Sequence, residues 1–170
     1  LCLVQLSNGD GDAHLIQLGS NFGYKAPNLK ALMKNKSILK IFHYARFDLG
    51  VIKKYLGIMP SNVYCTKIAS KIARTYSDKH GLRELCKELL GIEISKQQQS
   101  SYWGAKNLSK NQLKYAANDV LHLHQIKNEL EIILEKEKRS HLINKTLSFL
   151  PFRVQLDLLG WENIDIFSHS

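Results

Sequence analysis

Two isolated carboxylates and one tyrosine are the residues of this chain whose types and spacing could do chemistry. Eleven Lys or Arg residues and a single acidic residue, Asp48, lie between Ala13 and Ser77. Asp119 is likewise the only acidic residue between Ile94 and Asn128. Asp48 shares an apolar helical stripe with Ile52 and Leu56, and Tyr115 lies one helical turn before Asp119.

A carboxylate that faces a core is costly unless it is paired or binds a cation. Carboxylate oxygens suit hard divalent cations, and basic surroundings suit a phosphate backbone. The pattern therefore indicates a divalent-metal site, formed by Asp48 and Asp119, that acts on phosphate. The alternative is that Asp48 caps a helical turn and Asp119 pairs with a lysine.

The elements that must position these residues are strands first and helices afterwards. Ser109 and Gln112 have the spacing of a capping box, which starts a helix, and Gly91 is a natural helix end. Residues 140–170 are rich in large apolar side chains, so we expect that segment to dock on the rest of the chain. The predicted strands are 1–6, 14–18, 38–43 and 63–65, and the predicted helices are 27–33, 46–56, 68–75, 82–90 and one long helix over 109–138.

Composition narrows the class of protein. The 170 residues are 44% hydrophobic, which suits one domain with a core, and no apolar run approaches the roughly 20 residues that span a bilayer. Three widely spaced cysteines indicate neither a zinc knuckle nor a disulfide framework, so we expect a cytoplasmic protein without a membrane partner. The net charge of +9 favours nucleic acid as the partner, although it could serve solubility alone.

Four segments, in their order along the chain, resemble a known family. His43-Tyr44-Ala45-Arg46-Phe47-Asp48-Leu49 and Tyr115-Ala116-Ala117-Asn118-Asp119-Val120 are similar to two acidic motifs of the ribonuclease D-like 3′–5′ exonucleases. These belong to the DEDD superfamily, in its tyrosine-bearing DEDDy subclass. The segment 96–103 is similar to a further segment of the family, and the apolar tail resembles the end of small, single-domain members, so the resemblance covers nearly the whole chain.

The resemblance implies a fold and an activity. The fold is α/β: a ribonuclease H-like mixed sheet flanked by helices, as in DnaQ-like exonucleases, with residues 1–139 as the exonuclease domain and 140–170 docked on it. The activity is hydrolysis of phosphodiester bonds from the 3′ end of RNA or single-stranded DNA with two divalent cations, Mg²⁺ or Mn²⁺. Asp119 would bind the first ion, Asp48 would act on the second, and Tyr115 would hold the attacking water. The alternative is a catalytically impaired nucleic-acid-binding remnant.

Departures from the family pattern put parts of that activity in doubt. The family carries two further acidic residues, as Asp-x-Glu, on a strand ahead of the position of Leu1, and we expect that strand to be missing from a chain that opens on an apolar stretch without methionine. Tyr44 stands where the family usually has Asn, and Tyr102 stands where it usually has Asp. The predicted nucleic-acid contacts are His43, Arg46, Gln99, Trp103 and Lys114, with His43 and Trp103 also open to a purely structural role. The oligomeric state stays open.

Overall fold

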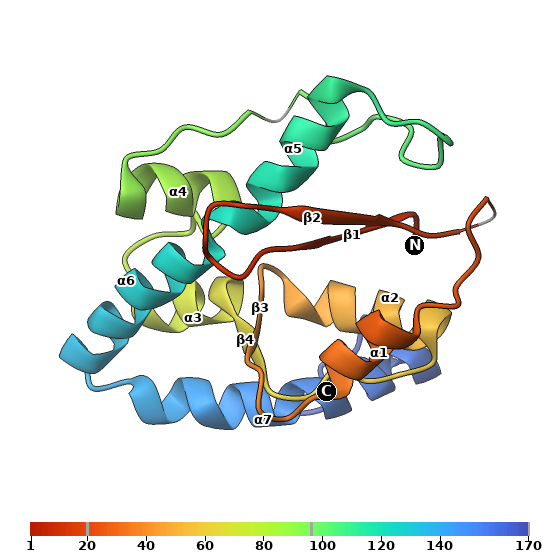
Figure 1. Ribbon diagram of the computed structural model, residues 1–170. Helices are drawn as coiled ribbons and strands as arrows, with labels where there is room; N and C mark the ends of the chain where they lie inside the picture. The colour runs from red at the N-terminus through yellow and green to blue at the C-terminus, as the bar shows by residue number, and fades with distance from the viewer. Residues whose placement is uncertain (20, 96, 170) are drawn as a thin grey trace.

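An antiparallel hairpin and a parallel strand pair form two small sheets in the computed structural model of the chain (Figure 1). Residues 1–19, 21–95 and 97–169 are described. Strand β1 (Leu3–Leu6) pairs with β2 (His14–Gln17), and β3 (Lys40–Phe42) pairs with β4 (Val63–Cys65). The helices that surround them confirm the predicted α/β class.

The two strand pairs do not join into one sheet within the described residues. Strand β1 pairs only with β2, and β3 pairs only with β4. Among the described residues, the outer edge of each strand therefore has no hydrogen-bonded partner strand. The single mixed sheet implied by the resemblance is thus represented by two separate halves. The hairpin lies alongside α5, whereas β3 and β4 lie among α2, α3 and α6 (Figure 1).

Seven α-helices are described, and most match the predicted ranges. The capping box is confirmed: the Ser109 hydroxyl accepts a hydrogen bond from the Gln112 backbone, and the Gln112 side chain accepts one from the Ser109 backbone. Gly91 ends its helix at φ 69°, as predicted. The helices are α1 (Pro27–Lys34), α2 (Ala45–Leu56), α3 (Thr66–Ala73), α4 (Leu82–Leu90), α5 (Lys110–Leu121), α6 (Leu123–Lys136) and α7 (Ser140–Leu156), and a short π-helical turn, η1 (Asp157–Trp161), follows α7.

The long helix predicted over 109–138 is wrong as one element, because it breaks at His122 into α5 and α6. The two halves pack on different partners: α5 contacts β1 and β2, and α6 contacts α3 and α4. At the break, the hairpin turn comes close enough that a Cβ on Gly9 would lie 3.1 Å from the His124 ring. One straight helix could not serve both surfaces, so tertiary packing overrides the local helical pattern.

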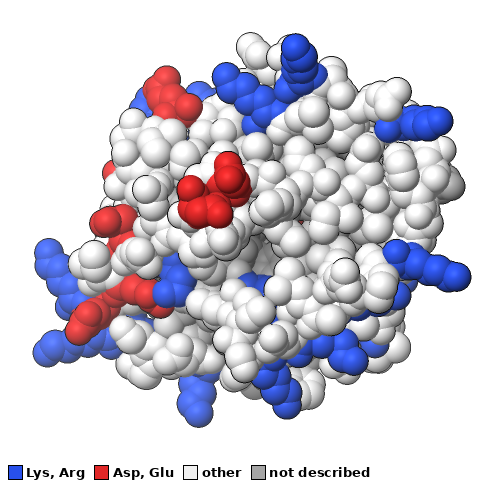
Figure 2. All heavy atoms as spheres, in the orientation of Figure 1, with Lys and Arg blue, Asp and Glu red and all other residues white. Residues whose placement is uncertain are grey.

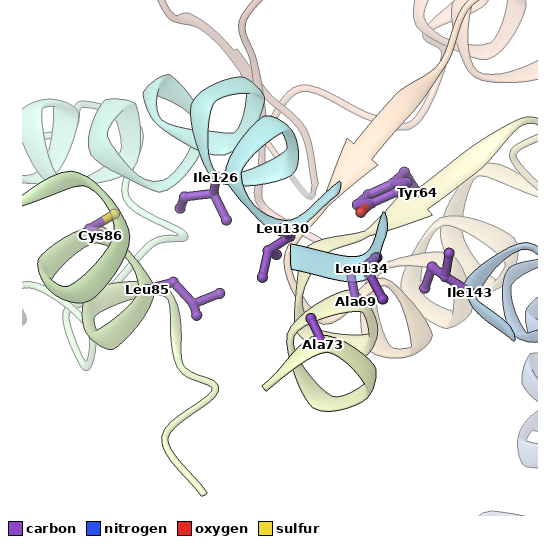
Figure 3. Close-up of a cluster of buried hydrophobic side chains, with 9 residues drawn as sticks. All are labelled: Tyr64, Ala69, Ala73, Leu85, Cys86, Ile126, Leu130, Leu134 and Ile143. Atoms are coloured by element: carbon purple, nitrogen blue, oxygen red, sulfur yellow. The ribbon is translucent and has the colours of Figure 1, made fainter. Parts of the chain in front are cut away.

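The main core lies where α6 crosses α3 and α4 (Figure 3). Leu85 of α4 and Ile126 and Leu130 of α6 have no exposed surface. Side chains of α3, β4 and α7 complete this cluster. This packing fixes the position of α6, whereas the contacts with β1 and β2 fix that of α5.

The C-terminal segment docks on α2 through α7. Leu150 and Val154 of α7 pack against Ala45 and Leu49 of α2. Beyond α7 the large apolar side chains are exposed, among them Leu159 and Phe167. The division of the chain at residue 140 stays a prediction. None of the described helices has the length and apolarity to cross a membrane.

Candidate active site

The site is built where two parallel strands end side by side. Phe42 of β3 lies opposite Cys65 of β4, so the residues that follow each strand emerge at the same edge. Helices α2 and α3 begin there. Asp48 falls in the first turn of α2, where a negative charge is favoured by the helix dipole.

Asp48 and Asp119 converge although they lie on different helices, α2 and α5. Burial and the negative charge of Asp119 raise the pKa of Asp48 from its usual 3.8 to about 7. Burial raises the pKa of Asp119 to about 6. Two carboxylates with raised pKa values at one place form a centre that gains from binding a cation or a shared proton.

Helix α5 brings Tyr115 to the same place. Burial and the charge of Asp119 raise the pKa of Tyr115, so its hydroxyl stays protonated near neutral pH. The rings of Tyr115 and Trp103 lie 6.0 Å apart between centroids. Trp103 is half-buried and supports this tyrosine. Burial and the charge of Asp119 also raise the pKa of the buried Cys86 thiol to about 11.

His43 directly follows β3, and its side chain is hydrogen-bonded to Thr66 at the start of α3. The His43 Nδ1 atom lies 2.9 Å from Thr66 Oγ1, and the same hydroxyl oxygen lies 3.2 Å from the Phe42 carbonyl oxygen. Burial, together with the charge of Lys67, lowers the pKa of His43 to about 4. The imidazole is neutral at physiological pH.

The other predicted nucleic-acid contacts are more scattered. Arg46 is held by Asp157, with Nε and Nη2 at 2.6 and 2.7 Å from its carboxylate oxygens. Gln99 and Lys114 are exposed, and Lys96 of the same predicted segment lies outside the described residues. Figure 2 shows Lys and Arg side chains spread around the rim of one face, with the acidic side chains gathered towards its left.

The donor set fits a divalent cation in part. Asp48 and Asp119 supply two hard, anionic oxygen donors whose mutual repulsion a cation would relieve. Within the described residues, no group of three His, Cys, Asp or Glu side chains could hold a metal ion. Mg²⁺ commonly binds through one or two carboxylates together with waters and substrate phosphates. The pair therefore suits an ion that the substrate helps to hold.

Two residues at the site were missed by the sequence reasoning. Phe47 is exposed beside Asp48, and its ring stacks on that of Tyr44. Lys67, at the start of α3, places its ammonium group over the Tyr44 ring. The signal for Lys67 was the strand pair itself: residues that follow the ends of adjacent parallel strands meet at one edge.

The fold and the carboxylate pair define a class, the α/β domains of nucleic-acid exonucleases. The chain belongs to the 3′–5′ exonuclease family, whose family model matches residues 1–135. This confirms the family resemblance, while the tyrosine-bearing subclass stays a proposal.

Relatives and solved structures agree with that membership. Ribonuclease D of Gluconacetobacter diazotrophicus is 33% identical over 168 residues, which cover 96% of this chain and 42% of that protein. The structure of Brucella melitensis NrnC is 55% identical with a TM-score of 0.95, covering 99% of this chain and 82% of that chain. Escherichia coli RNase D is 25% identical with a TM-score of 0.78, covering 90% and 40%. The chain thus spans about two fifths of the length of the curated relatives that it matches.

Proposed function

We propose that this chain carries the centre of a metal-dependent exonuclease that removes nucleotides from the 3′ end of RNA or single-stranded DNA. The observation that carries the proposal is the convergence of Asp48, Asp119 and Tyr115, with both carboxylate pKa values raised. In support, structures of Brucella melitensis NrnC have been solved bound to pGG and with bound Mg²⁺. The three cysteines are free, and we propose a cytoplasmic location.

In this proposal the two carboxylates bind the cations, and the tyrosine hydroxyl positions the water. Asp48 and Asp119 would hold two divalent cations, Mg²⁺ or Mn²⁺, through their carboxylate oxygens, together with waters and substrate phosphates. When bound, the cations supply Lewis-acid stabilisation of the scissile phosphate and of the attacking and leaving oxygens. The Tyr115 hydroxyl, which is protonated near neutral pH like that of any tyrosine with a pKa of 10 or higher, would orient the attacking water as in the tyrosine-bearing subclass. Trp103 positions the Tyr115 ring by packing against it.

One observation favours the alternative for residues 1–170 alone, a nucleic-acid-binding unit of low activity. Only two carboxylates converge among the described residues, and no larger group of metal-ligating side chains forms there. The family resemblance assigns two more carboxylates to a strand ahead of Leu1. Each half-sheet has open strand edges among the described residues, and we propose that such a strand pairs there and contributes its two carboxylates to the site of Asp48 and Asp119.

The test uses the protein continued upstream of Leu1 through an Asp-x-Glu strand. A 5′-labelled single strand with Mn²⁺ should shorten by one nucleotide at a time, and a circular single strand should resist. Asp119→Asn should abolish the shortening, and Tyr115→Phe should slow it by about 100-fold. Cleavage of the circular strand, or equal activity in Asp119→Asn, would overturn the proposal.

A further inference from the structure

We propose that three side-chain amides clamp the loop that carries Trp103 and thereby hold the Tyr115 hydroxyl in position for the proposed reaction. The amides are those of Gln17, Asn21 and Gln112, and together they are called the amide clamp below. They are positioning residues, because they act through Trp103 rather than on the substrate. The inference rests on the proposed function, which assigns the Tyr115 hydroxyl to the attacking water.

Each amide of the clamp donates a hydrogen bond to a backbone carbonyl close to Trp103. One of these carbonyls precedes Trp103 and two follow it, so the backbone is held on both sides of the ring. The donor–acceptor pairs are Gln112 to Tyr102 at 3.1 Å, Asn21 to Gly104 at 3.3 Å and Gln17 to Ala105 at 3.2 Å. Carbonyls in an irregular loop have no ladder or helix to pair with, and side-chain donors satisfy them instead.

The donors of the clamp come from both sides of the loop. Gln17 belongs to β2, Asn21 follows that strand, and Gln112 lies in the first turn of α5. The loop is therefore held between the hairpin and the helix that carries Tyr115, and these two elements also contact each other. Residues 97–108 contain neither helix nor strand, so the side-chain bonds take the place of regular backbone pairing there.

Gln112 shows most clearly that the loop needs an amide at this position. Its Oε1 atom accepts the Ser109 backbone N–H at 2.9 Å in the capping box, a role that a glutamate fills equally well. Its Nε2 atom donates to Ser101 Oγ at 3.2 Å as well as to the Tyr102 carbonyl, which a glutamate carboxylate could not do. Gln112 is also buried, so both of its polar atoms need partners.

The clamped loop brings Trp103 against Tyr115. The two rings are half-buried, with centroids 6.0 Å apart and planes inclined by 42°. This contact restrains the Tyr115 ring from outside its own helix. A hydroxyl that orients a reacting water must be held closely, because a misplacement of about 1 Å can cost about 100-fold in rate.

The first measurement is the fluorescence of Trp103 in the 170-residue chain, in which Trp161→Phe makes Trp103 the only indole. At pH 8, Gln112→Glu keeps the acceptor of the capping box and removes both donated bonds. We predict emission at longer wavelength and stronger quenching by acrylamide, with unchanged helix content by circular dichroism. Gln125→Glu changes an exposed glutamine of α6 in the same way and should alter neither signal. Unchanged emission and quenching in Gln112→Glu would overturn the clamp.

The second measurement is the rate at which the protein continued upstream through an Asp-x-Glu strand shortens a 5′-labelled single strand. Gln112→Glu should lower kcat by about 10-fold or more and change KM little. In a Tyr115→Phe background the same substitution should have no further effect, because no hydroxyl is left to position. Gln17→Leu removes a different bond of the clamp without touching the capping box, and it should show the same dependence on Tyr115.

The outcomes separate the clamp from the proposed function. Equal losses of kcat with and without the Tyr115 hydroxyl, or a change confined to KM, would overturn the positioning role. If Trp103 responds as predicted but the continued protein degrades no strand, the proposed function fails and the clamp on Trp103 stands. If strands are degraded but Gln112→Glu leaves both kcat and the Trp103 fluorescence unchanged, the clamp fails and the proposed function stands.

Discussion

Asp48 is a carboxylate that folding buries beside another carboxylate. The folded protein therefore holds a proton on Asp48 up to about pH 7, whereas the unfolded chain releases it near its usual pKa of 3.8. Since the folded state binds more protons in this window, the free energy of unfolding falls as the pH rises from about 4 to about 7. A cation that binds both carboxylates would reverse that loss.

Asp48→Asn tests this directly. At pH 8 and without divalent metal, the variant should be more stable than the parent by about 1 to 4 kcal/mol, and near pH 4 the difference should vanish. Denaturant unfolding at both pH values measures it, with Asp12→Asn, an exposed carboxylate of the hairpin turn, as the control. Identical pH profiles for Asp48→Asn and the parent would show that Asp48 is not buried beside Asp119.

At the scale of secondary-structure elements, one carboxylate connects helices α2 and α7. Asp157, at the end of α7, accepts from Arg46 of α2 and also pairs with Arg153, at 3.1 Å. Arg46 and Arg153 in addition donate to backbone carbonyls of the turn around Glu162. Because Arg46 is engaged in this way, we expect it to stabilise the fold more than it binds nucleic acid.

Asp157→Ala should therefore lower the free energy of unfolding by about 1 to 2 kcal/mol, since a charged hydrogen bond is lost at a half-buried position. Oligonucleotide affinity should hardly change. Paired thermal unfolding and binding measurements separate the two effects. A protein of unchanged stability with weakened binding would instead assign Arg46 to the nucleic-acid surface.

Sequence patterns predicted the elements well where the signal is local. The Ser109–Gln112 capping box and the helix end at Gly91 each depend on a few neighbouring residues. The start of α5 and the end of α4 therefore lie where the sequence pattern predicted them. The break at His122 has no local signal, because it results from the different packing partners of α5 and α6. Lys67 was missed for the same reason: its place beside Tyr44 depends on strand pairing between residues 23 apart in the chain.

Net charge acts on the whole molecule. At +9, with basic side chains around the rim of the face in Figure 2, the chain should attract polyanions over a distance of several ångströms. Binding of a single strand should then weaken by about 10-fold or more between 50 and 200 mM salt. A filter-binding or anisotropy titration across that range measures the slope. A flat response would show that the charge serves solubility alone.

The measurement that tests the central claim most directly is Mn²⁺-dependent digestion of a 5′-labelled single strand by three proteins. These are the 170-residue chain, the protein continued upstream through an Asp-x-Glu strand, and the continued protein with Asp119→Ala. We predict one-nucleotide shortening by the continued protein, little by the 170-residue chain, and none after Asp119→Ala, because two carboxylates alone hold the cations weakly. Brisk shortening by the 170-residue chain would contradict the need for two further carboxylates. If the continued protein does not shorten the strand, that result would contradict the proposed exonuclease activity itself.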